Sequence, residues 1–332
     1  MISCAKTLKT ALAALLLILP FSLAPCAEAR AQTHDITIAG GGSGGVMSVM
    51  AEGFGEVLRR GMPGSRVTTE PGKDGPNQVM VSRNQIPFAL GYECVSKRGL
   101  MGLPPYKTKL ENLRAVGVLC TISGLQFIVD AKTGITSIEQ IKERKYPLRV
   151  AVNRAGSVMD VAAEALFKSY GFTYKDIESW GGKVMKIPGP ETMSLWDAGQ
   201  VDAIIEISQF PTSRFVELAQ KHNLNILSID PAKQAALNAE LGTESIVIAA
   251  GTYPFVKEPC PTINTKVLIM TSAEQPDALI SGAVQAILDN IKYLHGVHVN
   301  LQNLTPEVIA KDILIPLHPA AEKKYREIGV LK

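Results

Sequence analysis

The chain has 332 residues, of which 46% are hydrophobic and 20% are charged. These proportions exclude a disordered or fibrous protein, and the length allows about two domains of roughly 150 residues each. The formal net charge is only +3, and aromatic residues make up only 6% of the chain. Proteins that grip nucleic acid need a basic surface and stacking side chains, so no nucleic-acid partner is expected.

The first 31 residues have the three parts of a secretory signal peptide. Lys6 and Lys9 precede an apolar run over residues 11–19, and a polar stretch then leads to Ala29-Arg30-Ala31. A basic start, a short apolar centre and a small-x-small ending predict cleavage near Ala31. A retained membrane anchor is the alternative, although the run is shorter than the about 20 residues of a spanning helix. We therefore expect an exported protein.

Short apolar runs alternate with stretches of helical spacing through the rest of the chain. In chain order, the predicted strands are residues 36–39, 66–69, 88–91, 114–119, 127–129, 148–152, 184–187, 203–207, 226–229 and 267–270. The predicted helices are residues 46–60, 158–169, 193–198, 211–221 and 278–294. Runs of this length and β-branched content fit strands buried on both faces of a mainly parallel sheet. The alternation predicts an α/β fold with two sheets.

One strand–turn–helix unit recurs in the two halves of the chain. Ser43-Gly-Gly-Val-Met-Ser-Val-Met-Ala-Glu52 aligns with Ala155-Gly-Ser-Val-Met-Asp-Val-Ala-Ala-Glu164. Two lobes of similar build would each point a helix N-terminus at a shared cleft, where unpaired amides favour a carboxylate or phosphate. Chance similarity between two amphipathic helices is the alternative. Ser157 with Asp160 also has the spacing of a helix N-cap and its capping-box partner.

The glycine loop after the first strand fits two enzyme motifs formally. Gly40-x-Gly42-x-x-Gly45 matches a dinucleotide fingerprint, and Gly41-x-Ser43-x-Gly45 matches a nucleophile elbow. Five glycines among residues 40–45 match almost any glycine motif, and no histidine has the setting of a catalytic base. We expect neither an enzyme nor a bound cofactor. An exported hydrolase or oxidoreductase is the least favoured alternative.

The cysteines and histidines do not form a metal-binding pattern. Cys94, Cys120 and Cys260 follow the signal segment without any C-x-x-C spacing. Three buried thiols are favoured over one disulfide with a free thiol. His295 and His298 are three residues apart but have no third ligand nearby, so no metal site is expected.

Several segments carry a family resemblance when they are taken together and in this order. They are Ile38-Ala-Gly-Gly-Gly-Ser-Gly-Gly45, Leu113-Arg-Ala-Val116, Gly134-Ile-Thr-Ser-Ile-Glu-Gln-Ile141, Leu148-Arg-Val-Ala-Val-Asn-Arg-Ala-Gly-Ser157, Gly199-Gln-Val-Asp-Ala203, Gly251-Thr-Tyr-Pro254 and Ile315-Pro-Leu-His-Pro319. The series resembles the TAXI family of extracytoplasmic solute receptors, the binding proteins of a class of TRAP transporters.

The resemblance implies a bilobed, type II periplasmic-binding-protein fold. After the signal peptide at residues 1–31, residues 32–126 with 270–332 would form the first lobe, and residues 127–269 the second. It implies a periplasmic, monomeric receptor that captures a small organic acid or an amino acid, such as glutamate or a dicarboxylate, between its lobes. The receptor would deliver this ligand to the membrane subunit of a TRAP permease. A periplasmic ligand sensor with the same fold is the main alternative.

The resemblance also implies where the ligand binds. Carried over by position, the binding residues are Gly42, Ser43 and Gly44 of the first lobe and Asn153, Gly156, Ser157 and Met159 of the second.

Two further segments depart from the family pattern at expected pocket positions. Gly91-Tyr92-Glu93 stands where relatives often carry a Gln-Ser-Asp-type segment, and Ser208-Gln209-Phe210-Pro211 stands where they often have small residues or glycine before a proline. Tyr92, Glu93, Ser208 and Gln209 are therefore expected to reshape the pocket. Gln126 is a further candidate near the crossing strand.

Overall fold

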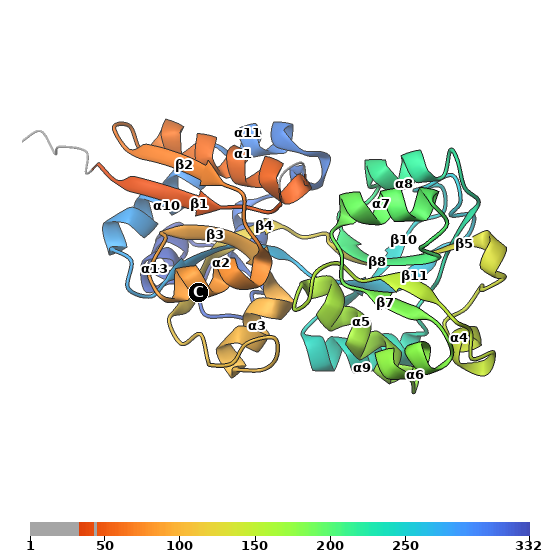
Figure 1. Cartoon of the computed structure of the whole chain (residues 1–332). Coiled ribbons are helices and arrows are strands. Elements are labelled where there is room, and N and C mark those ends of the chain that lie inside the picture. The colour runs from red at the N-terminus through yellow and green to blue at the C-terminus, as the bar shows by residue number, and fades with distance from the viewer. Residues whose placement is uncertain (1–32, 43–44) are drawn as a thin grey trace, which may run out of the picture. The chain divides into compact units, whose positions relative to one another are not determined.

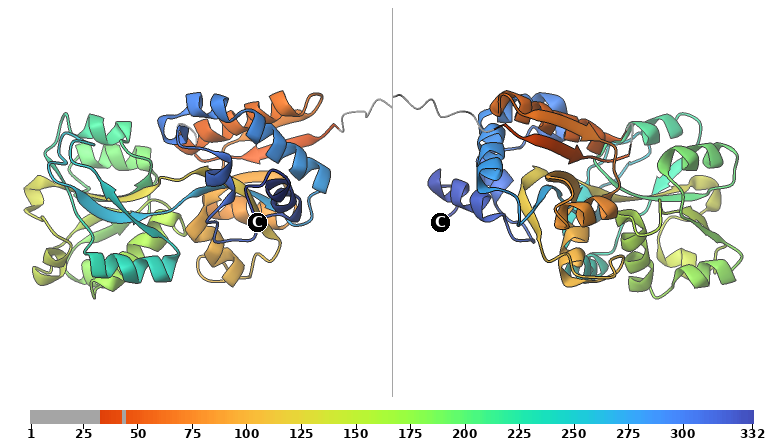
Figure 2. Two further views of the ribbon diagram at one scale, coloured as in Figure 1. Left: turned by 180° about the vertical axis from the view of Figure 1, so that it is seen from behind. Right: turned by 60° about the vertical axis from the view of Figure 1, so that its left-hand side comes forward.

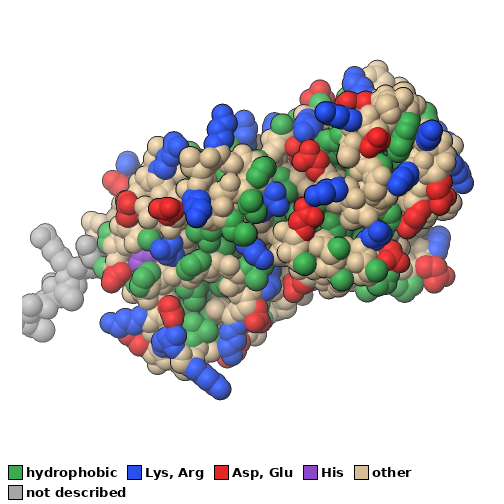
Figure 3. Space-filling view, turned by 90° about the horizontal axis from the view of Figure 1, so that it is seen from below, with side chains coloured by type: hydrophobic (Ala, Val, Ile, Leu, Met, Phe, Trp, Pro, Cys, Tyr) green, Lys and Arg blue, Asp and Glu red, His purple; other side chains and the backbone are tan. Residues whose placement is uncertain are grey.

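A computed structural model describes residues 33–42 and 45–332 of the chain (Figure 1). The predicted signal peptide, Ser43 and Gly44 lie outside the described residues. Within the described part, no helix is both long enough and apolar enough to cross a membrane. Acidic and basic side chains are interspersed on the face shown in Figure 3, which accords with the small net charge.

The first sheet has the strand order β2-β1-β3-β12-β4. β1 (Asp35–Ala39) pairs in parallel with both β2 (Arg66–Glu70) and β3 (Phe88–Tyr92). β12 (Val267–Ser272) is antiparallel to β3 and to β4 (Leu113–Cys120). A strand from late in the chain thus completes a sheet begun at the amino end.

Alternate residues of these strands pack on opposite faces of the first sheet. Ile38, Leu90 and Ile269 belong to one apolar cluster with helices α1 (Val46–Gly61) and α10 (Asp277–Asp289). Their neighbours in sequence, Ala39, Ala89 and Leu268, pack in a second cluster with α2 (Asp74–Ser82). Figure 1 shows α1 and α2 on the two sides of this sheet. Burial on both faces explains why these strands read as unbroken apolar runs.

The second sheet has the strand order β10-β11-β5-β8-β6-β7, and β9 also pairs with β5. Its strands are β5 (Gly124–Asp130), β6 (Arg149–Ala151), β7 (Lys183–Met185), β8 (Ala203–Ser208), β9 (Leu224–Ile226), β10 (Glu244–Ile248) and β11 (Cys260–Asn264). β6 is parallel to β7 and β8, whereas β5 is antiparallel to β8. The sheet is therefore mixed, like the first.

Helices again cover both faces of the second sheet. Ile128 and Ile204 pack in a cluster with α7 (Gly189–Asp197) and α8 (Ser213–Leu218). The alternate residues of the same strands pack with helices that Figure 1 shows on the other side: α5 (Val158–Ser169), α6 (Tyr174–Ser179) and α9 (Pro231–Leu241).

The remaining helices flank the two sheets. They are α3 (Glu93–Met101), α4 (Glu139–Glu143), α11 (Ile291–Val297), α12 (Pro306–Ala310) and α13 (Pro319–Glu327), with short 3-10 turns η1 (Ala131–Thr133) and η2 (Val299–Leu301). The blue carboxyl-terminal helices lie beside the orange amino-terminal elements in Figure 2, and α10 contacts both α1 and α13.

Two short crossings connect the sheets and are bonded to each other. The chain passes from β4 to β5 between Cys120 and Gly124, and returns from β11 to β12 between Asn264 and Val267. The Ser123 amide donates to Asn264 Oδ1 at 2.7 Å. The second sheet thus begins at Gly124 and the first resumes at Val267. Each of these strands starts three residues before the corresponding expected lobe boundary, which was residue 127 for the second lobe and residue 270 for the return to the first.

Every predicted strand and helix overlaps an observed one, but several elements were not predicted. The predicted helix over residues 278–294 is two helices, α10 and α11, separated at Asn290. β10 and β11 were missed, as were α2, α3, α4, α6, α9, α12 and α13. The recurring unit is a strand, turn and helix in each half: β1 with α1, and β6 with α5.

Candidate functional site

The β1–α1 turn is held tightly against its own helix. The hydroxyl of Ser48 donates to the carbonyl oxygens of Gly41 and Gly42, at 3.1 and 2.8 Å. A Cβ at Gly40 would lie 2.8 Å from the Cβ of Ala51, so only glycine fits there. A Cβ at Gly42 would meet no atom within 4 Å, and Gly42 is exposed. This turn therefore offers backbone groups at an open position after β1.

The β6–α5 turn is built differently and uses side-chain caps. Ser157 Oγ accepts the amide of Asp160 at 3.3 Å, which confirms the predicted N-cap. Asp160 Oδ2 accepts from the amide of Gly156 at 2.8 Å rather than from that of Ser157, and Gly156 has a φ of +74°. The cap uses a lone pair of Ser157, so the hydroxyl proton is not consumed by it. Met159 is 8% exposed and packs in the apolar core.

Tyr92 and Glu93 are adjacent in sequence but serve different contacts. The Tyr92 hydroxyl donates to the Ile207 carbonyl oxygen at 3.1 Å, which joins the end of β3 to the end of β8. Glu93 Oε1 accepts the amide of Leu314 at 2.7 Å, and burial raises the pKa of this carboxyl. Tyr92 therefore bridges the two sheets, whereas Glu93 fixes the segment around Leu314.

Ser208, the last residue of β8, and Gln209, which follows it, take part in buried hydrogen-bond networks. The Gln126 side-chain amide donates to Ser208 Oγ at 3.0 Å, and its carbonyl accepts from the Tyr253 hydroxyl. The Gln209 amide donates to Ser123 Oγ at 3.1 Å. Ser208 and Gln126, both candidates from the sequence, are thus in direct contact, and Gln209 ties the end of β8 to a crossing segment.

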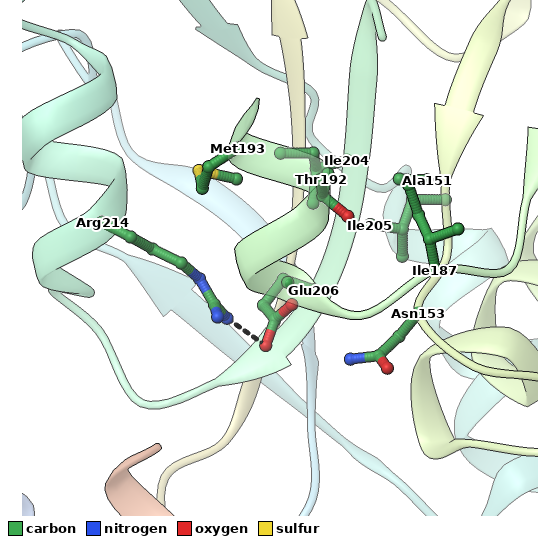
Figure 4. A pocket seen from close by; sticks show the side chains of 10 residues that line it. Ala151, Asn153, Ile187, Thr192, Met193, Ile204, Ile205, Glu206 and Arg214 are labelled. Atoms are coloured by element: carbon green, nitrogen blue, oxygen red, sulfur yellow. Dashed lines mark ion pairs between the residues drawn. The ribbon is translucent and has the colours of Figure 1, made fainter. Parts of the chain in front are cut away.

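A small pocket at the carboxyl ends of β6 and β8 holds an ion pair between a buried carboxylate and a partly exposed guanidinium (Figure 4). Arg214 Nη2 of α8 lies 2.5 Å from Glu206 Oε1 of β8, and Asn153 lines the same pocket. Burial raises the pKa of Glu206, and the Arg214 charge opposes this rise. A Cβ at Gly189 would lie 2.6 Å from Arg214 Nη1, so this glycine makes room for the guanidinium. Arg214 Nε is buried without a hydrogen-bond partner among the described residues.

A second buried group lies at the amino end of α2, which the sequence did not predict. Asp74 Oδ1 accepts from Gln78 Nε2 at 2.9 Å and from the Tyr92 amide at 3.0 Å. A Cβ at Gly91 would lie 2.8 Å from Asp74 Oδ1, so glycine admits the carboxyl group. Burial raises the pKa of Asp74 to about 6, and the two hydrogen bonds oppose this rise.

Tyr92 connects the Asp74 region to the Glu206–Arg214 pair. Its amide donates to Asp74, and its hydroxyl donates to the carbonyl of Ile207, the residue after Glu206. Burial raises the pKa of its hydroxyl, the negative charges of Glu206 and Asp74 raise it further, and the Arg214 charge lowers it. All three groups are thus close enough to act on the Tyr92 hydroxyl. The site places a guanidinium on the side of β8 and a carboxylate on the side of α2.

The cysteines that the structure describes are buried thiols. Cys94, Cys120 and Cys260 are free and buried, as the sequence favoured. Burial raises the pKa of Cys94 to about 12 and that of Cys120 to about 11, so both are protonated thiols at neutral pH rather than nucleophiles. Across residues 33–42 and 45–332, no group of three or more His, Cys, Asp or Glu could hold a metal ion.

Solved structures share this fold at low sequence identity. MatC from Rhodopseudomonas palustris, with bound malate, is 12% identical with a TM-score of 0.55, over 82% of this chain and 90% of that one. The periplasmic binding protein BugD is 12% identical with a TM-score of 0.53, over 89% and 94%. R. palustris Rpa4515 with adipate is 15% identical with a TM-score of 0.50, over 78% and 83%.

These similarities confirm the bilobed α/β fold of periplasmic binding proteins. A comparison of the sequence with protein-family models identifies the family of this chain. The model of the NMT1-like family matches residues 38–329, which is nearly all of the part that the structure describes. The chain therefore belongs to the NMT1-like family.

Proposed function

We propose that this protein is an exported, monomeric receptor that binds a small organic acid or amino acid between its two lobes. It would release this ligand to a membrane permease, and the resemblance to TAXI receptors favours a permease of the TRAP class. The family membership supports a solute-binding role, as do the likenesses to MatC with malate and Rpa4515 with adipate. In this proposal the protein binds and releases its ligand unchanged.

The observation that carries the proposal is Arg214 Nε, a guanidinium nitrogen with no hydrogen-bond partner in the described part of the chain. A buried donor without a partner costs about 1–3 kcal/mol, so such a donor is an expected contact for a ligand acceptor. Guanidinium groups bind carboxylates through charge-assisted hydrogen bonds. Asn153 lines the same pocket and offers a side-chain amide on the other side of Glu206 in Figure 4. A ligand carboxylate fits this donor set.

The loop residues predicted from the sequence complete the proposed site. Gly42, Ser43 and Gly44 would supply backbone and hydroxyl contacts from the first lobe. Gly156 and Ser157 would do the same from the second. The Tyr92–Ile207 bond, at 3.1 Å, would hold the lobes together around the ligand. Ser208, Gln209, Glu93 and Met159 would support these contacts through the buried bonds and packing described above.

A thermal-shift screen with mono- and dicarboxylic acids and with amino acids tests this function. A ligand that binds the folded state raises the melting temperature by mass action, so one narrow group of acids should stabilise the purified protein. Arg214→Lys keeps a positive charge beside Glu206 but removes the guanidinium donors, and should weaken binding about 10- to 100-fold. Arg326→Lys, in the exposed pair with Glu322 on α13, is the matched control and should bind like the wild type.

Two results would count against the function. The first is a broad panel in which no acid raises the melting temperature. The second is an acid that binds Arg214→Lys as tightly as the wild type, which would move the carboxylate site elsewhere.

A further inference from the structure

Tyr253, in the loop between β10 and β11, is a buried tyrosine that packs against the helix carrying Arg214. Its side chain is 1% exposed, and its ring stacks on Phe255 with 5.0 Å between the ring centroids. Phe215 of α8 packs against the same ring in a T-shaped arrangement at 6.3 Å. Burial raises the pKa of the Tyr253 hydroxyl, so this group remains a hydrogen-bond donor at neutral pH.

The Tyr253 hydroxyl closes a ring of hydrogen bonds at the start of α8. It accepts the Thr212 amide at 2.8 Å and donates to Gln126 Oε1. Gln126 Nε2 donates to Ser208 Oγ at 3.0 Å, and Ser208 Oγ lies 3.1 Å from Thr212 Oγ1. Because Thr212 Oγ1 donates to the Gln209 carbonyl oxygen at 2.7 Å, Ser208 is the donor to Thr212. Tyr253 is thus both an acceptor and a donor in a closed ring.

The position of α8 depends on this ring. The helix has only six residues, and its N-cap Thr212 makes no side-chain cap bond. Isolated helices shorter than about 12 residues are marginal in water, so α8 needs outside contacts to hold its place. The Tyr253 hydroxyl on the Thr212 amide and the packing of Phe215 supply such contacts to its first turn.

The ring is also connected to both members of the ion pair in the pocket. Arg214 follows Thr212 by two residues, and Glu206 precedes Ser208 by two residues. Gln126 lies opposite Glu206 in the register of β5 and β8. A displacement of Thr212 would therefore move Arg214 relative to Glu206. Hydrogen bonds between guanidinium and carboxylate groups depend on such geometry.

We propose that Tyr253 is a positioning residue for the ligand site, whose hydroxyl holds the first turn of α8 and so places Arg214 beside Glu206 with Nε available to the ligand carboxylate. Tyr253 does not touch the ligand and acts through Arg214. This inference rests on the proposed function, because it assigns the support of the group that would bind the carboxylate.

Nuclear magnetic resonance of the ligand-free protein tests this role without any ligand. The Nε–H resonance of Arg214 is observed in protein that contains isotope-labelled arginine, and is identified by its absence in Arg214→Lys. Tyr253→Phe should shift this resonance and speed its exchange with water. Tyr325→Phe is the matched control, because Tyr325 is 0% exposed and its hydroxyl donates to the Val116 carbonyl oxygen at 3.0 Å in the first lobe. It also loses one buried hydrogen bond, but should leave the Arg214 resonance unchanged.

A double-mutant cycle tests whether Tyr253 affects binding through Arg214. Titration calorimetry uses succinate, glutarate and glutamate as probes. For a probe that binds the wild type, Tyr253→Phe should weaken binding about tenfold, and Tyr325→Phe by less than about twofold. In the Arg214→Lys background, Tyr253→Phe should have less than about a threefold effect, because the two residues act as a unit.

The outcomes separate the positioning role from the receptor function. An Arg214 resonance that is unchanged in Tyr253→Phe, or equally shifted in Tyr325→Phe, would overturn the role, as would a Tyr253→Phe effect on binding of the same size with and without Arg214. If Tyr253→Phe does not fold, Ser208→Ala breaks the ring at another bond, and an unchanged Arg214 resonance in that variant overturns the role. If the resonance shifts as expected but no probe and no acid of the wider screen binds the wild type, the hold of Tyr253 on Arg214 is confirmed and the receptor function fails.

Discussion

Asp74 is a buried carboxyl group with no basic partner among residues 33–42 and 45–332, and this has a consequence for stability. Its pKa is about 6 because burial opposes ionisation, whereas the same group in an unfolded chain ionises near pH 4. The folded state therefore favours the neutral carboxyl. Its contribution to the free energy of unfolding is complete below about pH 4 and is lost as the pH rises through about 6. Asp74→Asn cannot ionise and should not suffer this loss.

The first prediction is a pH-dependent gain in stability for Asp74→Asn in the absence of ligand. The shift in pKa corresponds to at most about 3 kcal/mol once the group is ionised. The melting temperature of the variant should match the wild type near pH 4, and exceed it by several degrees at pH 8. Asp289→Asn, which changes a carboxyl that accepts from Gln285 on the exposed face of α10, should show no such difference. A variant that is less stable than the wild type at pH 8 would contradict the account of the buried charge.

The residues of the site were predictable from sequence to different degrees. Tyr92 was a candidate because it stands at an expected pocket position of the family that the chain resembles, and its hydroxyl donates to the Ile207 carbonyl oxygen. Asp74 and Arg214 were not candidates, although they are two of the charged groups that act on the Tyr92 hydroxyl. Their proximity depends on how α2 and α8 pack against the ends of β3 and β8, which no local spacing in the sequence records.

At the scale of elements, the two recurring turns differ in how their helices begin. Gly45 precedes α1 without a side-chain cap, while Ser157 caps α5. Because Ser157 Oγ can accept the Asp160 amide and still donate its proton to a ligand, one side chain would serve both the helix and the site.

Ser157→Ala tests that double role. Loss of an N-cap costs about 1 kcal/mol, so the free energy of unfolding should fall by about that amount. Thr305→Ala removes the corresponding cap of α12, where Thr305 Oγ1 accepts the Val308 amide at 3.2 Å, and should cost the same. Calorimetry should show weaker ligand binding only for Ser157→Ala. Unchanged affinity would remove Ser157 from the site and leave it as a helix cap.

Elements that the sequence missed have identifiable reasons. β11 begins Cys260-Pro261, and proline normally argues against a strand. Pro261 has no N–H to donate, but its carbonyl accepts the amide of Ile229, and the strand pairs with β10. α2 carries Gly75 and Pro76 in its first turn, which reads as a loop in sequence. Tertiary packing decides both cases.

At the scale of the whole molecule, the alternation of strands and helices was sufficient to predict two sheets. Sequence order alone does not show which strands belong to which sheet. β12 follows the strands of the second sheet in the chain, but it pairs with β3 and β4 of the first sheet. The resemblance of the motif series gave the bilobed fold, which the similarities to MatC and BugD confirm. The ligand is not set by this fold, and in the proposed site its choice would depend on the few side chains around Tyr92.

The most direct test of the central claim is titration calorimetry of the purified protein with the acid that stabilises it most in the thermal screen. One ligand molecule should bind per chain, and the ligand should be recovered chemically unchanged after the protein is denatured. Binding should also give a negative heat-capacity change, because closure around a ligand buries apolar surface. Absence of binding by every acid, or conversion of the ligand into a product, would contradict the claim that this protein is a solute receptor.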